Sequence, residues 1–73
     1  MSRKRIKVLF SEISDPEISE SFAIVAEAWG TVYRDDAART IVILPNPTDA
    51  QQLRDQIRAL SDVGVLESWS EAG

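Results

Sequence analysis

The sequence predicts a two-layer α+β sandwich of four strands and two helices, in the order β-α-β-β-α-β. Three observations predict this class. Four short runs alternate or are rich in β-branched residues, as strands are, and the segments between them repeat apolar residues at helical spacing. The halves also echo each other, which is a third observation. A shift of 35 residues overlays Ile18, Phe22 and Val25 on Leu53, Ile57 and Leu60, and a shift of 34 overlays RIKVLF on RTIVIL and Gly30 on Gly64.

The first strand is expected in RIKVLFSE, where apolar and other residues alternate. Ile6, Val8 and Phe10 fall on one side of it, and Lys7, Leu9 and Ser11 fall on the other. SDPE then predicts a helix start, with Asp15 as N-cap and Pro16 at the first helical position. The apolar stripe of this helix is predicted to contain Ile18, Phe22, Val25, Ala26 and Trp29. Gly30 is expected to end the helix as a C-cap glycine.

A hairpin is predicted next, with strand 31–34 paired to strand 40–44. Asp35 and Asp36 suit the turn between them, because Asp side chains bond nearby backbone and tolerate unusual dihedral angles. The hairpin is therefore the expected link between the two halves.

The second helix is predicted to begin in PNPTDAQQ. Thr48 with Gln51 fits a capping box, although Asn46 competes for the N-cap position. The stripe of this helix is Ala50, Leu53, Ile57 and Leu60. DVGVLESWS reads as a last strand that ends near Trp69. We expect one domain over residues 1–73, with a flexible basic arm at 1–4 and a frayed tail at 70–73.

Two βαβ units connected in this way make the ferredoxin-like split βαβ sandwich. Its antiparallel sheet has the strand order 4-1-3-2 and both helices on one side. The first and third strands are then the central ones. The sequence thus predicts that the other side of the sheet is open.

The run TIVIL, residues 40–44, is apolar on both sides of this central strand, whereas one-sided antiparallel strands normally alternate. Either Ile41 and Ile43 face the helices and Val42 and Leu44 face outward, or the reverse. The residues expected on the outer side are Leu9, Tyr33, Val42, Leu44 and Leu66. Such a patch predicts a homodimer or a protein partner. The alternative is that the long side chain of Lys7 or Arg34 covers the patch in a monomer.

The composition argues against most catalytic and metal chemistry. The 73 residues contain no cysteine and no histidine, and no glycine-rich phosphate loop. Glu12, Asp15, Glu17 and Glu20 gather at the first helix start, where carboxylates are favourable without any chemistry. We expect no enzyme, no catalytic residue, no cofactor and no metal. The absence of a long apolar segment or a signal-peptide pattern predicts a cytoplasmic protein.

The charge is unevenly distributed along the chain. Four of the eight basic residues lie near the N-terminus, at Arg3, Lys4, Arg5 and Lys7, and the remaining chain is strongly acidic. The alternative function is therefore a small nucleic-acid-binding protein that uses these four side chains. RNA-recognition motifs share the predicted topology, but they stack bases on an aromatic pair that the central strands here lack. Nucleic acid is thus the less expected partner.

The segment RTIVILPNPTDAQQLRDQIRALSDVGVLESWS resembles the second half of ACT-type regulatory domains. There, a strand, a polar turn and a helix precede a "gV" strand that returns to the sheet. The resemblance covers about half of the chain, and it implies a small domain that dimerises and responds to small molecules such as amino acids. ACT domains commonly have an Asp-x-Pro-Gly-type turn after the first strand. This chain has SDPEIS, with Glu17 in place of the glycine, so the resemblance assigns no effector residues.

Taken together, the sequence predicts a small non-enzymatic regulatory or interaction module. Its open sheet face is expected to bind a second copy or another protein. The alternatives are a nucleic-acid-binding protein and an ACT-like sensor of a small ligand.

Overall fold

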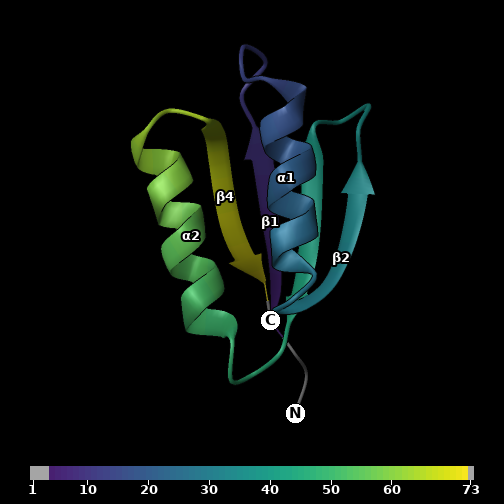
Figure 1. Ribbon diagram of the computed structural model, residues 1–73, viewed down its shortest axis with the longest axis vertical. Coiled ribbons are helices and arrows are strands. Elements are labelled where there is room, and N and C mark those ends of the chain that lie inside the picture. Colours follow the sequence, from purple (N-terminus) through teal and green to yellow (C-terminus); the bar gives the residue numbers. More distant parts are fainter. Residues whose placement is uncertain (1–3, 73) are drawn as a thin grey trace.

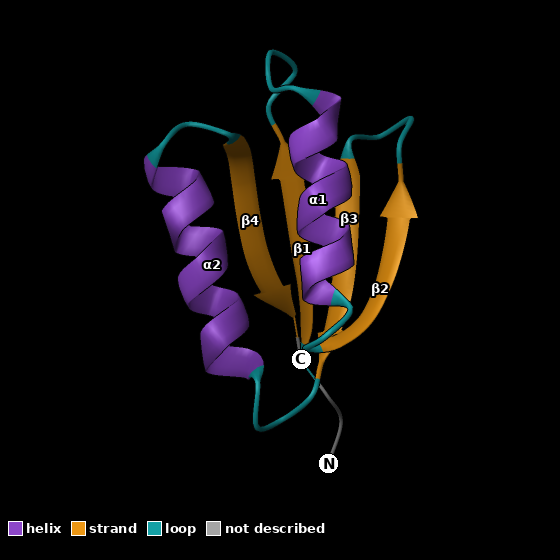
Figure 2. Cartoon of the chain, viewed as in Figure 1, coloured by secondary structure: helices purple, strands orange, loops and turns teal. Residues whose placement is uncertain are grey.

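Residues 4–72 are the ones that the structure, a computed structural model, describes. They form one antiparallel sheet of four strands, with two helices on one side (Figure 1). The predicted order of elements is confirmed, and Figure 2 distinguishes the helices from the strands. The bounds are β1 Arg5–Phe10, α1 Pro16–Ala26, β2 Gly30–Asp35, β3 Thr40–Pro45, α2 Ala50–Asp62 and β4 Leu66–Ala72.

The sheet has the strand order β2-β3-β1-β4, and every neighbouring pair is antiparallel. Counted from the β4 edge, the same order reads 4-1-3-2. β1 and β3 are therefore the central strands, as the sequence predicts. The two helices leave the opposite side of the sheet uncovered (Figure 1).

The register of the two central strands decides which of their residues face the helices. Ile6 pairs with Ile43, and Val8 pairs with Ile41. All four side chains are at most 2% exposed. Ile41 and Ile43 thus face the helices, which is the first of the two alternatives that the sequence leaves open.

The helices cover this side of the sheet with a small number of large side chains. Leu53 and Ile57 of α2 are fully buried, and Phe22 of α1 is 4% exposed. These residues and the inward side of the sheet form a single apolar cluster. Its buried members are Ile6, Val8, Phe10, Phe22, Ala23, Ala26, Ile41, Ile43, Leu53, Ile57 and Leu66.

The start of α1 is confirmed. The Asp15 carboxylate accepts a hydrogen bond from the backbone N–H of Glu17 over 2.9 Å, and Pro16 is the first helical residue. An N-cap side chain satisfies one of the backbone donors that the first helical turn leaves without a partner. Acidic Glu17 lies in the same turn, where the helix dipole favours a negative charge.

The predicted end of α1 is wrong. The helix ends at Ala26 with Glu27 as C-cap, so Trp29 lies beyond it, half-buried against the core. Val25, expected in the buried stripe, is 45% exposed and lines a groove between the two helices. The buried side of α1 is formed by Phe22, Ala23 and Ala26. This buried side contains fewer residues than the number of apolar residues in the helix suggests.

Gly30 is the first residue of β2 and does not cap a helix. Its φ is not in the left-handed region, unlike that of Gly64, which has a φ of 80°. A Cβ atom added to Gly30 would lie 2.3 Å from the carbonyl oxygen of Leu44 and 2.7 Å from the Cα of Pro45. Glycine is therefore required here because β3 approaches the backbone closely.

The predicted turn between β2 and β3 is confirmed. The Asp35 carboxylate accepts a hydrogen bond from the N–H of Ala38 over 3.2 Å, and the N–H of Arg39 donates to the carbonyl of Asp36. Arg39 has a φ of 52°, which is unusual for a residue other than glycine. The turn thus closes with its last residue in the left-handed region.

The predicted capping box of α2 is wrong. The helix begins after Asp49, which makes no side-chain capping bond, and neither Thr48 nor Asn46 is the N-cap residue. Gln51 donates instead to the carboxylate of Asp55, one turn further along the helix. The predicted stripe is confirmed at Leu53 and Ile57, the helix residues that are fully buried, and Leu60 is half-buried. Tertiary packing, and not the cap, fixes this helix.

The sheet extends further at its C-terminal strand than the sequence predicts. β4 continues to Ala72, which pairs with Arg5, and Ser70 pairs with Lys7. A frayed tail from residue 70 is therefore wrong for residues 70–72. Of the predicted basic arm, residues 1–3, including Arg3, lie outside the described residues, and Lys4 is exposed.

The two halves repeat with one shift of 35 residues in their first strands as well as in their helices. This shift places Ile6 on Ile41 and Val8 on Ile43, and all four are buried. The shift of 34 that the letters suggested places inward residues on outward ones, so it is wrong for the strands.

Candidate interaction surface on the open side of the sheet

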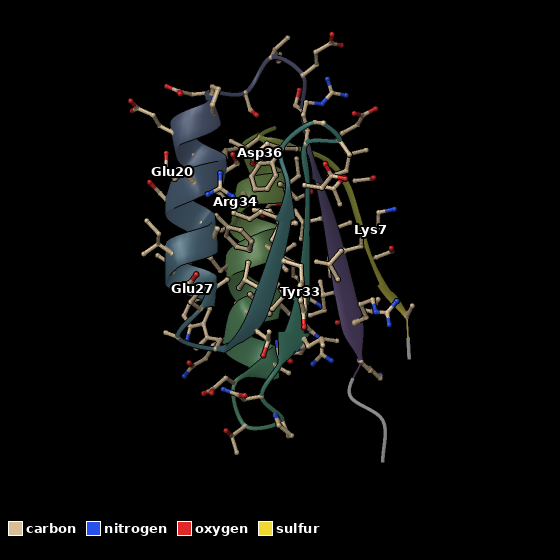
Figure 3. The ribbon with its side chains drawn as sticks, turned by 90° about the vertical axis from the view of Figure 1, so that its right-hand side faces the viewer. Lys7, Glu20, Glu27, Tyr33, Arg34 and Asp36 are labelled. Atoms are coloured by element: carbon tan, nitrogen blue, oxygen red, sulfur yellow. The ribbon has the colours of Figure 1, made fainter. Side chains whose placement is uncertain are left out.

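The side of the sheet that faces away from the helices is formed by alternate residues of the four strands, because side chains along a strand point to opposite sides in turn. We call this surface the outer sheet face. Figure 3 shows Lys7 and Tyr33 on this side, and Glu20 of α1 on the far side of the molecule. The main members of the outer sheet face are Arg5, Lys7, Leu9, Thr31, Tyr33, Thr40, Val42, Leu44, Ser68 and Ser70.

Apolar side chains gather where β2, β3 and β1 lie next to one another. Tyr33 pairs with Val42 and is 56% exposed. Leu9, Val42 and Leu44 are partly exposed. Tyr33, Val42 and Leu44 line an open hollow of about 360 Å³ together with Arg5. The outer sheet face thus brings together four of the five residues that the sequence places on it.

Leu66, the fifth predicted residue, is not on this face. It is 8% exposed and belongs to the buried core. The cause is an irregularity in the pairing of β1 with β4: Leu9 pairs with Ser68, but the next residue, Phe10, pairs with Leu66. The extra residue, Glu67, reverses the side to which Leu66 points.

The basic residues of β1 border the apolar part of the face. Lys7 lies directly beside Val42 in the register, and Arg5 joins the lining of the hollow. Within the described part of the chain, neither Arg5 nor Lys7 forms an ion pair. Both side chains are exposed, so their charges are available to a partner.

One alternative from the sequence is that Lys7 or Arg34 covers the apolar patch. Arg34 does not cover it. It pairs with Ile41, which faces the helices, and its guanidinium lies 3.1 Å from the carboxylate of Asp36 (Figure 3). Lys7 is the remaining candidate for partial cover. Its position at the border of the apolar residues leaves Tyr33 exposed on the far strand of the hairpin.

The β4 side of the outer sheet face is polar. Ser68 pairs with Leu9 and Ser70 pairs with Lys7, and both serines are exposed. Neither serine was predicted on this face, although both flank Trp69, which packs against the core, and strand alternation then points them outward. The face therefore grades from apolar at β2 and β3, through basic at β1, to hydroxyl-bearing at β4.

A second hollow, of about 320 Å³, lies between the β1–α1 connection and the turn of the hairpin. Charges of both signs line it, and the Arg39 guanidinium lies 3.9 Å from the carboxylate of Glu12. Glu20 and Asp36 contribute to the same lining. The acidic residues predicted near the start of α1 are thus spread over a cap, an ion pair and exposed positions. Residues 4–72 contain no group of three side chains that could hold a metal ion.

Within the described residues, no helix is long and apolar enough to span a membrane. No family model, curated protein or solved structure matches the chain. The likeness of the second half to ACT-type domains therefore stays a prediction from sequence.

Proposed function

We propose that this protein is a non-enzymatic interaction module that binds a protein through its outer sheet face. We also propose that the sandwich is of the ferredoxin-like type. The element order β-α-β-β-α-β, the antiparallel neighbours and the central position of β1 and β3 support that type.

The observation that carries the proposal is the apolar surface of Tyr33, Val42 and Leu44 on two adjacent strands, with Leu9 diagonal to Val42 on β1. Full burial of one such side chain contributes about 1.5–3 kcal/mol, and a partly covered one contributes less. Association costs several kcal/mol in lost translational and rotational freedom, so a partner has to cover several of these side chains together. Their position on adjacent strands makes this possible for one docked element.

Nucleic acid is the second candidate partner, because Arg5 and Lys7 lie on the same face as the aromatic ring of Tyr33. A positively charged sheet with an exposed aromatic side chain is a general way to bind single strands. The formal net charge of −4 opposes it, and Tyr33 is the single aromatic residue among the outward positions of the described strands. A protein partner is therefore the better supported proposal.

Paired lysine substitutions on β3 test the proposal. Val42→Lys introduces a charge on the outer side, and we expect a folded chain that no longer associates. Ile43→Lys introduces an unpaired charge into a fully buried position, so we expect it to unfold the domain. Circular dichroism measures folding, and light scattering with affinity capture measures association. A wild-type chain that stays monomeric at high micromolar concentration and captures nothing contradicts the proposal.

The nucleic-acid candidate is separated by the salt dependence of binding. The double variant Arg5→Gln with Lys7→Gln removes two charges from the face. If nucleic acid is the partner, single-stranded RNA or DNA binds the wild type more weakly as salt increases, and the variant has a smaller salt slope. A protein partner held by apolar contacts is lost in Tyr33→Lys, while RNA and DNA show no salt-dependent binding.

A further inference from the structure

We infer that the occupant of the outer sheet face is helix α1 of a second copy of this chain. The inference rests on the proposed docking role of that face and names its partner. It starts from a second exposed apolar surface, which lies on the opposite side of the molecule.

The solvent-facing side of α1 combines exposed apolar residues with carboxylates. Ile24 is 64% exposed, although it is a large apolar residue in the last turn of α1. Glu17, Glu20 and Glu27 are exposed too, and they lie seven and four residues before Ile24 and three residues after it. At 3.6 residues per turn these four positions form one stripe. We call this stripe the acidic helix face.

The acidic helix face contains no positive charge of its own, and Arg34 and Arg39 approach it at Glu20, where all three line one hollow. The segment PEISESFAIVA of α1 contains no basic residue. Within the described residues, none of the three glutamates takes part in an ion pair. An exposed isoleucine bordered by unpaired carboxylates is the complement of an apolar surface bordered by unpaired basic residues.

The outer sheet face has that complementary character. Its apolar residues, including Tyr33 and Val42, lie beside Lys7 and Arg5 on β1. In the inferred contact, Ile24 of a second copy packs over β3 and its helix crosses the strands, so that glutamates of the stripe come within reach of β1. The basic residues Arg5 and Lys7 of each copy thus face the glutamates of the next copy.

The dimensions of the two elements agree. An α-helix of 11 residues is about 16 Å long, and a strand of six residues is about 20 Å long. A helix is about 10 Å wide, and strands are spaced about 4.8 Å apart, so one helix covers two to three strands. That width matches the apolar part of the face and leaves the serines of β4 in water.

The two surfaces point in opposite directions, with Glu20 on one side of the molecule and Lys7 and Tyr33 on the other (Figure 3). A contact between them is therefore head-to-tail and not two-fold symmetric. A head-to-tail contact leaves one unused surface at each end, so copies add in series or close into a ring. The wild type is expected to grow beyond a dimer as its concentration increases.

The test uses one variant that blocks each surface. Ile24→Lys blocks the acidic helix face, and Val42→Lys blocks the outer sheet face, with Tyr33→Lys as a second sheet variant should Val42→Lys lose its native circular dichroism spectrum. We expect each variant alone to be monomeric in sedimentation velocity. We expect an equimolar mixture to form a heterodimer and nothing larger, because one intact surface of each kind remains.

Charge-reversal variants then test whether the glutamates of one copy face Arg5 and Lys7 of the next. In the mixture, Glu20→Lys with Glu27→Lys on the helix partner is expected to weaken binding roughly tenfold at low salt, and Arg5→Glu with Lys7→Glu on the sheet partner is expected to do the same. Combining both reversals is expected to restore binding to within a few-fold of the starting mixture. Failure of the combination to restore it means that the charges do not face each other, which overturns the inference.

The outcomes also separate the inference from the proposed function. Self-association of Ile24→Lys at the wild-type strength, with Val42→Lys monomeric, means that sheet faces pair with each other. That result overturns the inference and leaves the docking role of the face intact. A monomeric wild type that binds a different protein, with binding lost in Val42→Lys, does the same. A monomeric wild type that binds nothing overturns both.

Discussion

The rings of Phe10 and Phe22 meet edge to face, with centroids 5.9 Å apart and planes inclined at 62°. Phe10 comes from the central strand β1 and Phe22 from the helix α1, so this contact joins the two layers. Both rings are almost fully buried. An aromatic pair in this geometry contributes about 0.5–1.5 kcal/mol beyond the burial of its area.

Phe22→Ala is therefore expected to lower the free energy of unfolding by about 3–5 kcal/mol, enough to unfold much of a small domain. Urea denaturation followed by circular dichroism measures the change. Ile24→Ala is the matched control on the same helix, because its side chain is 64% exposed, and at a concentration where the chain is monomeric it is expected to change stability by less than about 0.5 kcal/mol. Equal losses for the two variants contradict the assignment of the buried side of α1.

Leu66→Ala tests the position of the first residue of β4. Leu66 is 8% exposed and belongs to the core, so its truncation is expected to cost about 2–5 kcal/mol. Leu44→Ala removes the same atoms from the outer sheet face and is expected to destabilise the monomer much less. Thermal unfolding at a concentration where the chain is monomeric compares the two. A larger loss for Leu44→Ala would place Leu66 outside the core.

Gly30→Ala is expected to destabilise the fold by about 1–3 kcal/mol, since the added Cβ overlaps backbone atoms of β3. Gly64 is the informative control, because nothing lies within 4 Å of the site of its Cβ, while its φ of 80° disfavours most side chains. Asparagine visits this region readily. Gly64→Asn is thus expected to be milder than Gly64→Ala, whereas Gly30→Asn is no milder than Gly30→Ala. Chemical denaturation of the four variants gives the comparison.

Arg39→Gly is expected to stabilise the fold by about 0.5–1 kcal/mol. Its φ of 52° disfavours a residue with a side chain by about 1–2 kcal/mol, and the larger chain entropy of glycine offsets part of the gain. The exposed ion pair with Glu12, at 3.9 Å, contributes little. Ala38→Gly, one residue earlier and with an ordinary φ, is expected to destabilise instead. A loss of stability in Arg39→Gly would mean that its side chain holds the turn in place.

The central strands were predictable because Ile6, Val8 and Phe10 alternate with Lys7 and Leu9. The side of β3 that faces the helices was not, since residues 41–44 are all apolar and either set could be buried. The register with β1 decides it, and register depends on residues far apart in the chain. One-dimensional patterns carry no such information.

The errors at Leu66 and Val25 have different physical causes. An irregularity in pairing, such as the one between β1 and β4, leaves no mark in the letters of a strand and reverses every side chain beyond it. Val25 was misassigned because α1 has more apolar residues than the core has room for. The apolar residues that the core cannot hold lie on the surface of α1, as Ile24 does, and only the structure shows this.

The strand order has a consequence in time as well as in space. β1 precedes both of its neighbours by a long stretch of chain, since β3 begins at Thr40 and β4 at Leu66. The hairpin of β2 and β3 is the one strand pairing between segments that are close along the chain, so it is the sheet contact that can form early. The long loops that must close around β1 slow folding compared with a helical bundle of this size. Within this sheet β1 therefore lacks a partner on one edge until β4 has been synthesised, and Leu66 of β4 then completes the buried core.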